Sequence, residues 1–284
     1  MKLAVLADIH GNLAALESVA AQLDRWQPDL VAVAGDIVNR GPRPRECLEF
    51  VQERQRRDGW LAVRGNHEAY IISYAQPETV MTGLEFELYR SAYWTYRQLG
   101  GDVSALAALP FELNLAGPDG QPVQIVHASV HGANDGIFPR TSDDELRQKI
   151  LLPNRPPPAL FCTAHTHWPL IRSLEQTLVV NVGSVGLPFD GDRRAAYGQF
   201  TWRSGTWQAE IIRLDYDWRQ AERDFFETGY LPEGGPVVEL ILDELRTARP
   251  NLFKWTHRYQ EAILAQEIAL EEAVTAFLAE KESS

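Results

Sequence analysis

The stretch KLAVLADIH, residues 2–10, is an apolar run that ends in a carboxylate, Asp8, and an imidazole, His10. Residues 2–7 are apolar on both faces, which is typical of a strand buried in a sheet that helices cover. Leucines at helical spacing follow in residues 12–23, and Asn12 is placed to cap that helix. A buried strand followed directly by a helix predicts the first unit of a layered βαβ fold.

The same alternation continues through the next part of the chain. Residues 30–34 have the pattern of a second strand, residues 43–57 that of a helix, and residues 60–63 that of a third strand. Strand-like runs return later, mostly without helices between them, at 123–126, 159–163, 178–182, 195–202 and 207–214. These later runs suggest a second sheet packed on the first. The sequence therefore predicts an α/β (α+β) fold with two sheets and flanking helices.

Two helical regions lie outside this alternation. Residues 79–109 are helical and aromatic in pattern, and we interpret them as a helical cap inserted into a domain of residues 1–214. Residues 215–284 are predicted to form a helical C-terminal extension packed on that domain, interrupted at 231–236, with Asn251 capping its final helix. The apolar side of the final helix covers either the chain's own body or a partner subunit, so the oligomeric state stays open.

The composition narrows the class of protein. The 27 basic and 39 acidic residues give 27 − 39 = −12, a balance that argues against a nucleic-acid-coating role. A small phosphorylated substrate remains compatible with this charge, because bound dications reverse the field locally. Cys47 and Cys162 have no metal-type spacing and make no disulfide framework, and no apolar run reaches the ~18 residues of a membrane span. We therefore expect a cytoplasmic protein that does not enter a membrane.

Side chains that can bind metals follow the predicted strands. These residues are Asp8, His10, Asp36, Asn66, His67, His127, His165 and His167. In open α/β sheets ligands bind at the carboxyl ends of the strands, so we expect these side chains to share one rim. An isolated histidine is more often a satisfied core or surface residue, but five histidines at strand ends favour a common site.

The types and the number of these side chains indicate a site for two metal ions. Carboxylate and imidazole together suit Mn, Fe, Zn, Co or Ni better than Ca or Mg, and manganese is the ion that we expect. The candidates exceed what one tetrahedral ion with an open position can use. With Asp36 as a shared ligand, two ions ~3.5–4 Å apart account for the rest, as in two-metal hydrolases. The predicted sets are Asp8, His10 and His167 for one ion and Asn66, His127 and His165 for the other.

Five short motifs carry a resemblance to a known family. They are DIH at residues 8–10, GD at 35–36, GNHE at 65–68, VH at 126–127 and AHTH at 164–167. In order and rough spacing they resemble the motif blocks of the calcineurin-like metallophosphoesterases. The resemblance implies a four-layer fold, a two-sheet β-sandwich flanked by helices, which holds two metals with the ligand sets given above. The segment NVGSVGLP at residues 181–188 looks like one found in the small bacterial and archaeal branch.

The resemblance also implies roles for residues that are not ligands. The family uses the position of His67 to contact phosphate or to protonate the leaving oxygen, and Arg40 and Arg64 look like phosphate-binding arginines of the protein-phosphatase branch. A helix-starting histidine and solvated loop arginines are the alternatives. Protein phosphatases have an aspartate where this chain has Asn39, so the carboxylate that would orient and charge His67 is missing. Ala164 replaces the usual glycine, which a backbone outside the left-handed region tolerates.

Together these residues predict a hydrolase of phosphomonoesters, phosphodiesters or nucleotide polyphosphates, in which a hydroxide bridging the metals attacks phosphorus directly. Features of the protein-phosphatase and dinucleoside-polyphosphatase branches are both present, so the substrate stays open. A noncatalytic scaffold on the same fold is the alternative, and the complete ligand set disfavours it. The aromatic residues of 79–109 either stack on a base or form the core of the cap. His131 is interpreted as a loop residue and His257 as a solvated one.

Overall fold

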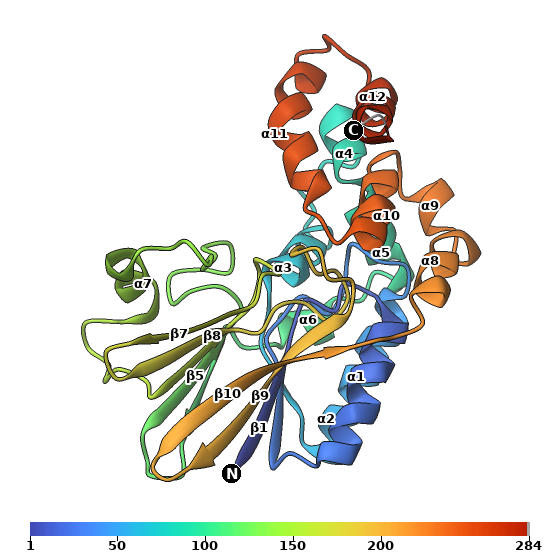
Figure 1. The fold of residues 1–284 in the computed structure, drawn as a ribbon. Coiled ribbons are helices and arrows are strands. Elements are labelled where there is room, and N and C mark those ends of the chain that lie inside the picture. Colours follow the sequence, from blue (N-terminus) through green and yellow to red (C-terminus); the bar gives the residue numbers. More distant parts are fainter. Residues whose placement is uncertain (283–284) are drawn as a thin grey trace.

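Two five-stranded sheets form the centre of the computed structural model, which describes residues 1–282 (Figure 1). The first sheet has the order β10-β9-β1-β2-β3 and contains β1 (Lys2–Leu6), β2 (Leu30–Val33), β3 (Leu61–Ala62), β9 (Ala195–Arg203) and β10 (Thr206–Leu214). The second has the order β4-β5-β6-β8-β7 and contains β4 (Glu112–Ala116), β5 (Pro122–Val126), β6 (Leu160–Thr163), β7 (Leu170–Leu174) and β8 (Thr177–Asn181). The predicted two-sheet fold is confirmed.

Parallel strands lie in the middle of each sheet. In the first sheet β1, β2 and β3 are parallel, and β9 pairs antiparallel to β1. In the second sheet β5, β6 and β8 are parallel, and the antiparallel edge strands β4 and β7 were not predicted from the sequence. The loops that follow β1, β2, β5 and β6 carry the predicted metal ligands other than Asn66, which is the first residue of the helix after β3. The ligands therefore come from the carboxyl ends of parallel strands, as expected.

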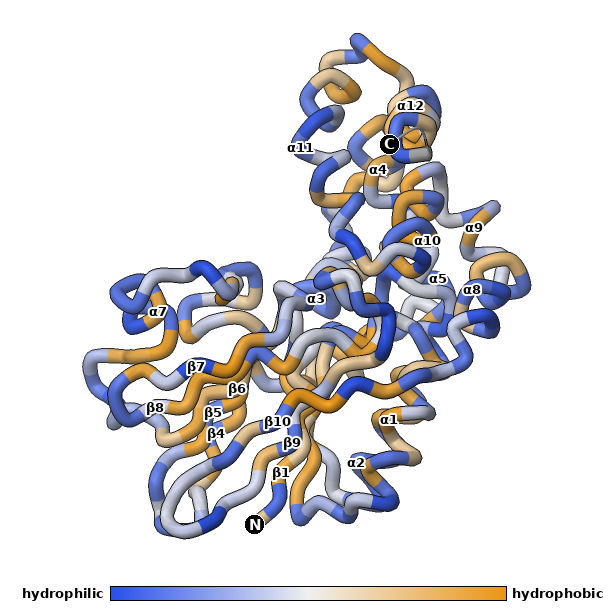
Figure 2. Tube along the Cα trace, in the orientation of Figure 1, coloured by the Kyte–Doolittle hydropathy of each residue, from blue (hydrophilic) through white to orange (hydrophobic). Residues whose placement is uncertain are grey.

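Helices cover both outer faces of the paired sheets. Apolar residues of the two sheets, such as Val5 and Cys162, pack together into one buried core between them. Helices α1 (Leu13–Trp26) and α2 (Pro44–Asp58) pack on the other face of the first sheet, and α7 (Asp143–Ile150) packs on the second. This arrangement gives the four predicted layers. Figure 2 shows apolar stretches in the strands and hydrophilic residues along the outer side of α2.

Local signals explain where several of these elements begin. Asn12 caps α1 as predicted, because its side-chain oxygen accepts the backbone N–H of Ala15 at 3.1 Å. Pro44 occupies the first turn of α2, where its missing N–H has no helical partner to lose.

Cys47 and Cys162 are both buried free thiols. No helix within residues 1–282 is long and apolar enough to cross a membrane.

The region predicted as a helical cap contains three short helices. After α3 (Asn66–Ser73) the chain forms α4 (Leu84–Leu88), α5 (Arg90–Gln98) and α6 (Ser104–Ala107). Its aromatic residues are mostly packed, since Trp94 is only 2% exposed and Tyr93 stacks on Tyr96. Tyr89 is an exception and is 51% exposed. Most of these aromatics therefore belong to the core of the region.

Five helices make up the C-terminal extension: α8 (Trp218–Glu227), α9 (Tyr230–Glu233), α10 (Val237–Thr247), α11 (Asn251–Leu264) and α12 (Leu270–Glu282). The interruption predicted at residues 231–236 is partly helical, because α9 includes its first three residues. Apolar residues of α10, α11 and α12 form a buried cluster with Leu88 of α4, and Figure 1 shows α11 and α12 beside α4. The extension therefore covers its own chain.

The prediction that Asn251 caps the final helix is wrong. Asn251 is the first residue of α11, which α12 follows, and its side chain makes no capping hydrogen bond. Instead its Nδ2 donates to Asp243 Oδ2 at 2.6 Å and to Thr247 Oγ1 at 3.1 Å. The side chain thus ties the start of α11 back to α10, because acceptors of the preceding helix lie within its reach.

Candidate metal centre

The loops that carry the candidate ligands have an unusual backbone. Asp8, His10, Asp36, His165 and His167 all have positive φ angles, between 48° and 67°. Residues other than glycine rarely adopt this left-handed region, and each one costs about 1–3 kcal/mol unless its surroundings impose it. Ala164, in contrast, is not among the positive-φ residues, so its replacement of glycine brings no strain. Strain gathered around one set of side chains indicates loops shaped for a site.

Gly65 and Glu68 hold the loops after β2 and β3 together. A Cβ on Gly65 would lie 2.1 Å from Asp36 Oδ1, so glycine alone permits this approach. The fully buried Glu68 carboxylate accepts the backbone N–H groups of Gly65, Asp36 and Ile37, each at 2.8 Å. Glu68 had no predicted role, although a carboxylate three residues after Gly65 has the spacing of a helix-capping box.

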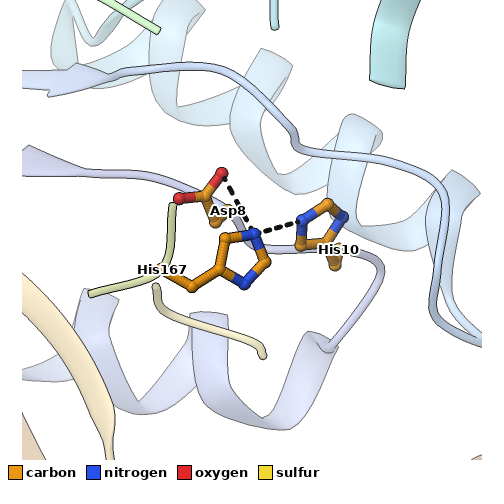
Figure 3. Close-up of side chains that lie close together, drawn as sticks. All are labelled: Asp8, His10 and His167. Atoms are coloured by element: carbon orange, nitrogen blue, oxygen red, sulfur yellow. Dashed lines mark hydrogen bonds and ion pairs between the residues drawn. The ribbon is translucent and has the colours of Figure 1, made fainter. Parts of the chain in front are cut away.

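One group of candidate ligands, the first cluster, consists of Asp8, His10 and His167 (Figure 3). The Nε2 atoms of the two histidines lie 3.2 Å apart, and Asp8 Oδ1 lies 3.7 Å from His167 Nε2. His10 Nδ1 donates to the Asn39 carbonyl at 3.2 Å, and His167 Nδ1 donates to the Leu187 carbonyl. Burial lowers the pKa of both histidines and keeps them neutral. Both Nε2 atoms therefore carry lone pairs that face each other.

The second cluster consists of Asn66, His127 and His165. Asn66 Oδ1 lies 2.8 Å from His127 Nε2 and 3.0 Å from His165 Nδ1, and these two nitrogens are 3.2 Å apart. His127 Nδ1 donates to the Ala34 carbonyl at 2.8 Å, so its Nε2 faces the other two residues. Burial lowers the pKa of His165 to about 4. The second cluster thus directs one oxygen and two imidazole nitrogens into one shared space.

Asp36 lies between the two clusters. Its Oδ2 is 3.3 Å from His127 Nε2 and 3.7 Å from His10 Nε2, while its Oδ1 accepts the backbone N–H of His67 at 2.9 Å. Burial would raise the pKa of Asp36, but the neighbouring His127 holds it well below its usual value. One oxygen of an ionised carboxylate therefore faces both clusters.

These donor atoms fit divalent cations better than they fit one another. Asp8 Oδ1 is buried and has no hydrogen-bond partner among residues 1–282. Nitrogen lone pairs that face each other at 3.2 Å repel unless a proton or a cation lies between them. Burial would lower the pKa of His127, yet the neighbouring Asp36 raises it to about 10, so positive charge is favoured at this position. The structure thus brings both predicted ligand sets together, and their nitrogen and oxygen atoms suit divalent metals.

His67 lies beside the clusters, with its Nε2 4.0 Å from Asp36 Oδ2 and its ring centroid 4.9 Å from that of His10. Asn39 Oδ1 accepts the backbone N–H of Arg40 at 2.9 Å, which turns Asn39 Nδ2 toward His67 Nδ1 at 2.7 Å. Because His67 Nδ1 accepts this hydrogen bond, the ring carries its proton on Nε2. Burial lowers the pKa of His67 to about 3, so the ring is neutral.

The two predicted phosphate-binding arginines have different surroundings. Arg40 Nη2 pairs with Glu244 Oε2 of α10 at 2.7 Å, and 14% of the Arg40 side chain is exposed. Arg64 lies two residues before α3 and is partly exposed, and within residues 1–282 its guanidinium has no ion-pair partner. For both arginines, contact with phosphate stays a prediction.

The loop of residues 128–141 borders the second cluster. His131 Nε2 donates to the Gln148 carbonyl at 2.9 Å, which agrees with its interpretation as a loop residue. Tyr70 OH donates to Asn134 Oδ1 at 2.9 Å and its ring centroid lies 5.3 Å from that of His67. Tyr70 therefore connects this loop to the side of the centre where His67 lies.

The segment after β8 surrounds the first cluster. Ser184 Oγ donates to the Asp8 carbonyl at 2.8 Å. The ring of Phe189 stacks on the ring of His167, with centroids 4.2 Å apart and planes at 10°. Residues 181–188 were singled out by their likeness to a family segment, but Phe189 follows that segment and no sequence pattern marked it.

Comparisons with known proteins agree with this geometry. A family model described as calcineurin-like phosphoesterase matches residues 1–193. An uncharacterised protein of Methanocaldococcus jannaschii is 27% identical over 245 residues, 77% of this chain and 89% of that protein. A symmetrical bis(5'-nucleosyl)-tetraphosphatase of Thioalkalivibrio sulfidiphilus is 35% identical over 78 residues, 27% of this chain and 28% of that protein. The crystal structure of a metallophosphoesterase from Sphaerobacter thermophilus matches with a TM-score of 0.66 and 25% identity, over 87% of this chain and 100% of that one.

Proposed function

The chain belongs to the calcineurin-like phosphoesterase family, and on that basis we propose that it hydrolyses phosphate esters with two divalent metal ions. The proposed substrates are small phosphomonoesters, phosphodiesters or nucleotide polyphosphates. The observation that carries this proposal is the place of Asp36, whose Oδ2 lies 3.3 and 3.7 Å from imidazole nitrogens of the two clusters. A carboxylate in that place is suited to be a ligand that two ions share.

The ligand sets follow from the two clusters. Asp8, His10 and His167 would hold one ion and Asn66, His127 and His165 the other, with Asp36 shared. Imidazole and carboxylate ligands favour Mn²⁺ as the ion, with Fe, Zn, Co and Ni as the other candidates. When bound, two such ions lower the pKa of a nearby water and neutralise charge on phosphoryl oxygens.

His67 and Arg64 complete the site as groups that contact substrate. The Nε2–H of His67 is placed to donate a hydrogen bond to a phosphoryl oxygen or to the leaving oxygen. Because the ring is neutral, it stabilises negative charge on that oxygen without transferring a full proton. Arg64 offers a guanidinium without an ion-pair partner in the described chain, a group that suits phosphate oxygens.

This arrangement favours substrates whose leaving groups are weak bases. A nucleotide polyphosphate releases a phosphate oxygen that needs little protonation, whereas an alkyl ester releases a strongly basic alkoxide. The local match to a symmetrical bis(5'-nucleosyl)-tetraphosphatase supports nucleotide polyphosphates among the proposed substrates. The net charge of −12 is compatible with such small anions only where bound cations reverse the local field.

A screen of the metal-reconstituted protein tests the proposal. The metal-free protein is loaded with Mn²⁺, Ni²⁺, Co²⁺ or Zn²⁺ and offered p-nitrophenyl phosphate, bis-p-nitrophenyl phosphate, cyclic nucleotides, dinucleoside polyphosphates and phosphopeptides. We expect hydrolysis that depends on added metal and that disappears in Asp36→Asn, the control. Inactivity on every substrate with every metal would contradict the proposal and favour a noncatalytic scaffold.

A further inference from the structure

Ion pairs of Arg40 and Arg43 tie the loop between β2 and α2 to the C-terminal extension. Arg40 Nη2 lies 2.7 Å from Glu244 Oε2 of α10, and Arg43 Nη2 lies 2.7 Å from Asp224 Oδ1 of α8. The side chains of Glu244 and Asp224 are 0% and 5% exposed. Both carboxylates lie beyond residues 1–193, which match the family model. The extension thus contacts the catalytic loop through buried charges.

The Arg40 pair leads to the metal centre through the backbone. Asn39 and Arg40 have φ angles of 67° and 60°, in the left-handed region, so outside contacts must hold them there. The Asn39 carbonyl accepts His10 Nδ1 at 3.2 Å, and Asn39 Nδ2 lies 2.7 Å from His67 Nδ1. Any shift of Arg40 therefore changes the orientation of two imidazoles.

A second route runs through an aromatic stack. The guanidinium carbon of Arg40 lies 5.6 Å from the centroid of the Phe189 ring, and Phe189 stacks on His167 at 4.2 Å. Glu244 Oε2 accepts a hydrogen bond from the guanidinium, and the second carboxylate oxygen of Glu244 accepts the backbone N–H of Leu252 at 2.8 Å. Arg40 is thus fixed between a rigid helix pair and a ring that covers a metal ligand.

We infer that Glu244 is a positioning residue of the metal centre: by holding Arg40, it sets the orientation of His10, His67 and His167. The inference uses the proposed function only in taking His10 and His167 as metal ligands. A buried carboxylate whose one ion-pair partner within residues 1–282 is Arg40 suits this role, because hydrogen-bond partners behind a ligand typically change metal affinity 10- to 100-fold. The extension thereby supplies part of the catalytic machinery.

Metal titration of Glu244→Gln and Asp224→Asn tests this role. Metal-free protein is titrated with Co²⁺ and followed by visible absorption, with circular dichroism and thermal unfolding to compare the structural effect of each change. We expect Glu244→Gln to weaken the binding of one Co²⁺ about tenfold. Asp224→Asn is the matched control, since it breaks a pair of equal length between the same loop and extension that reaches no histidine, and we expect wild-type affinities. Unchanged affinity in Glu244→Gln, or equal weakening in both variants, would overturn the inference.

A second measurement works without metal. Histidine ring nitrogen spectra of the metal-free protein report tautomer and hydrogen bonding, and we expect Glu244→Gln to shift signals of His10 and His67 while Asp224→Asn leaves them in place. This readout separates the inference from the proposed function, because it holds even for a protein that hydrolyses nothing. Identical spectra in wild type and Glu244→Gln would overturn the inference alone.

The Glu244→Gln variant could fail to fold because the Arg40 charge is left without its partner. The double variant Arg40→Met/Glu244→Gln covers that case. It buries no unpaired charge, so we expect it to fold. If Glu244 acts through Arg40, the double variant weakens Co²⁺ binding no more than either single change does. Effects that multiply would mean that the two residues act separately, and the inference would be wrong.

Discussion

The two halves of the candidate metal centre offer similar donor atoms but are held in different ways. In the first cluster Asp8, His10 and His167 are 0–2% exposed, and Arg40 and Phe189 connect it to the C-terminal extension. The second cluster borders the loop of residues 128–141, and its His165 is partly exposed. Motif residues thus provide the candidate ligands of both clusters. The first cluster also depends on helices of the C-terminal extension, which contains none of the motifs. The chemistry of a site and its rigidity are therefore encoded in different parts of the chain.

Asp36→Asn is the strongest test of whether the halves form one centre. Because Asp36 Oδ2 faces both clusters, we expect this variant to bind neither ion. Loss of a contact behind a ligand already lowers activity 10- to 100-fold, so we expect activity to fall by at least about 10³-fold. Elemental analysis and p-nitrophenyl phosphate turnover measure the two effects. A fully loaded Asp36→Asn protein would refute the shared ligand.

His10→Ala and His127→Ala separate the halves. Each removes one imidazole from one cluster, so we expect each variant to keep one ion and to lose about 10²-fold of its activity. Metal content and Co²⁺ absorption of the two variants distinguish the clusters. If either variant lost both ions, the halves would be a single unit and the comparison would fail.

Lowering the pH should weaken both halves. Burial raises the pKa of Asp8 well above its usual value, and against the effect of burial Asp36 raises the pKa of His127 to about 10, so each cluster binds protons more readily than its isolated groups would. A metal must displace these protons, and they compete more strongly as the pH falls. We expect the affinity for the ion of the second cluster, where His127 must release one proton, to fall about 100-fold from pH 8 to pH 6, and the affinity for the other ion to fall in the same direction.

Calorimetric titration in buffers of different ionisation enthalpy counts the protons released. His127→Ala should abolish the release at the second cluster and keep it at the first. Metal affinity that does not change between pH 6 and pH 8 would show that the metal-free clusters hold no such protons.

His67→Ala should have a smaller effect than the loss of any ligand, because His67 belongs to neither ligand set. A hydrogen bond to a charged group is worth about 1.5–3 kcal/mol, so we expect turnover about tenfold lower or somewhat more, with both ions retained. Steady-state kinetics and metal content measure this split. Loss of an ion from His67→Ala would make it a ligand and not a substrate contact.

Asn39→Asp tests the role of His67 in the opposite sense to His67→Ala, because it strengthens the ring as a proton donor and does not remove it. A carboxylate beside His67 Nδ1 raises the pKa of the ring and allows it to transfer a proton. We expect alkyl phosphates to be hydrolysed severalfold faster relative to p-nitrophenyl phosphate. An unchanged ratio would show that Asn39 does not limit the choice of leaving group.

Local signals explain which elements of the fold were predictable. The buried parallel strands β1, β2 and β6 leave apolar runs, and the metal-capable residues directly after them mark their ends. The edge strands β4 and β7 are half exposed, with Ile171 46% exposed, and so they lack such a run. Helix α7 is short and highly charged, and it carries too few apolar residues to show a helical stripe.

The residues of the site also fall into those that the sequence identifies and those that only the fold shows. Its candidate ligands lie in short motifs, so they are recognisable from the sequence alone. Glu244 is separated from Arg40 by 204 residues and lies in an ordinary amphipathic helix, where nothing distinguishes it from a solvated glutamate. Phe189 and the hydrogen bonds of Asn39 also depend on tertiary contacts. Such partners become visible only when the fold brings them together.

The pairing of β1 has a consequence for how the protein folds during synthesis. Lys2 lies opposite Thr201, so β9 pairs along one side of β1, the strand that precedes Asp8. While the chain leaves the ribosome, β1 has an open hydrogen-bonding edge until β9 has also emerged. The first strand to be made is thus among the last to be enclosed, and during that interval it is a natural target for chaperones and for unwanted partners.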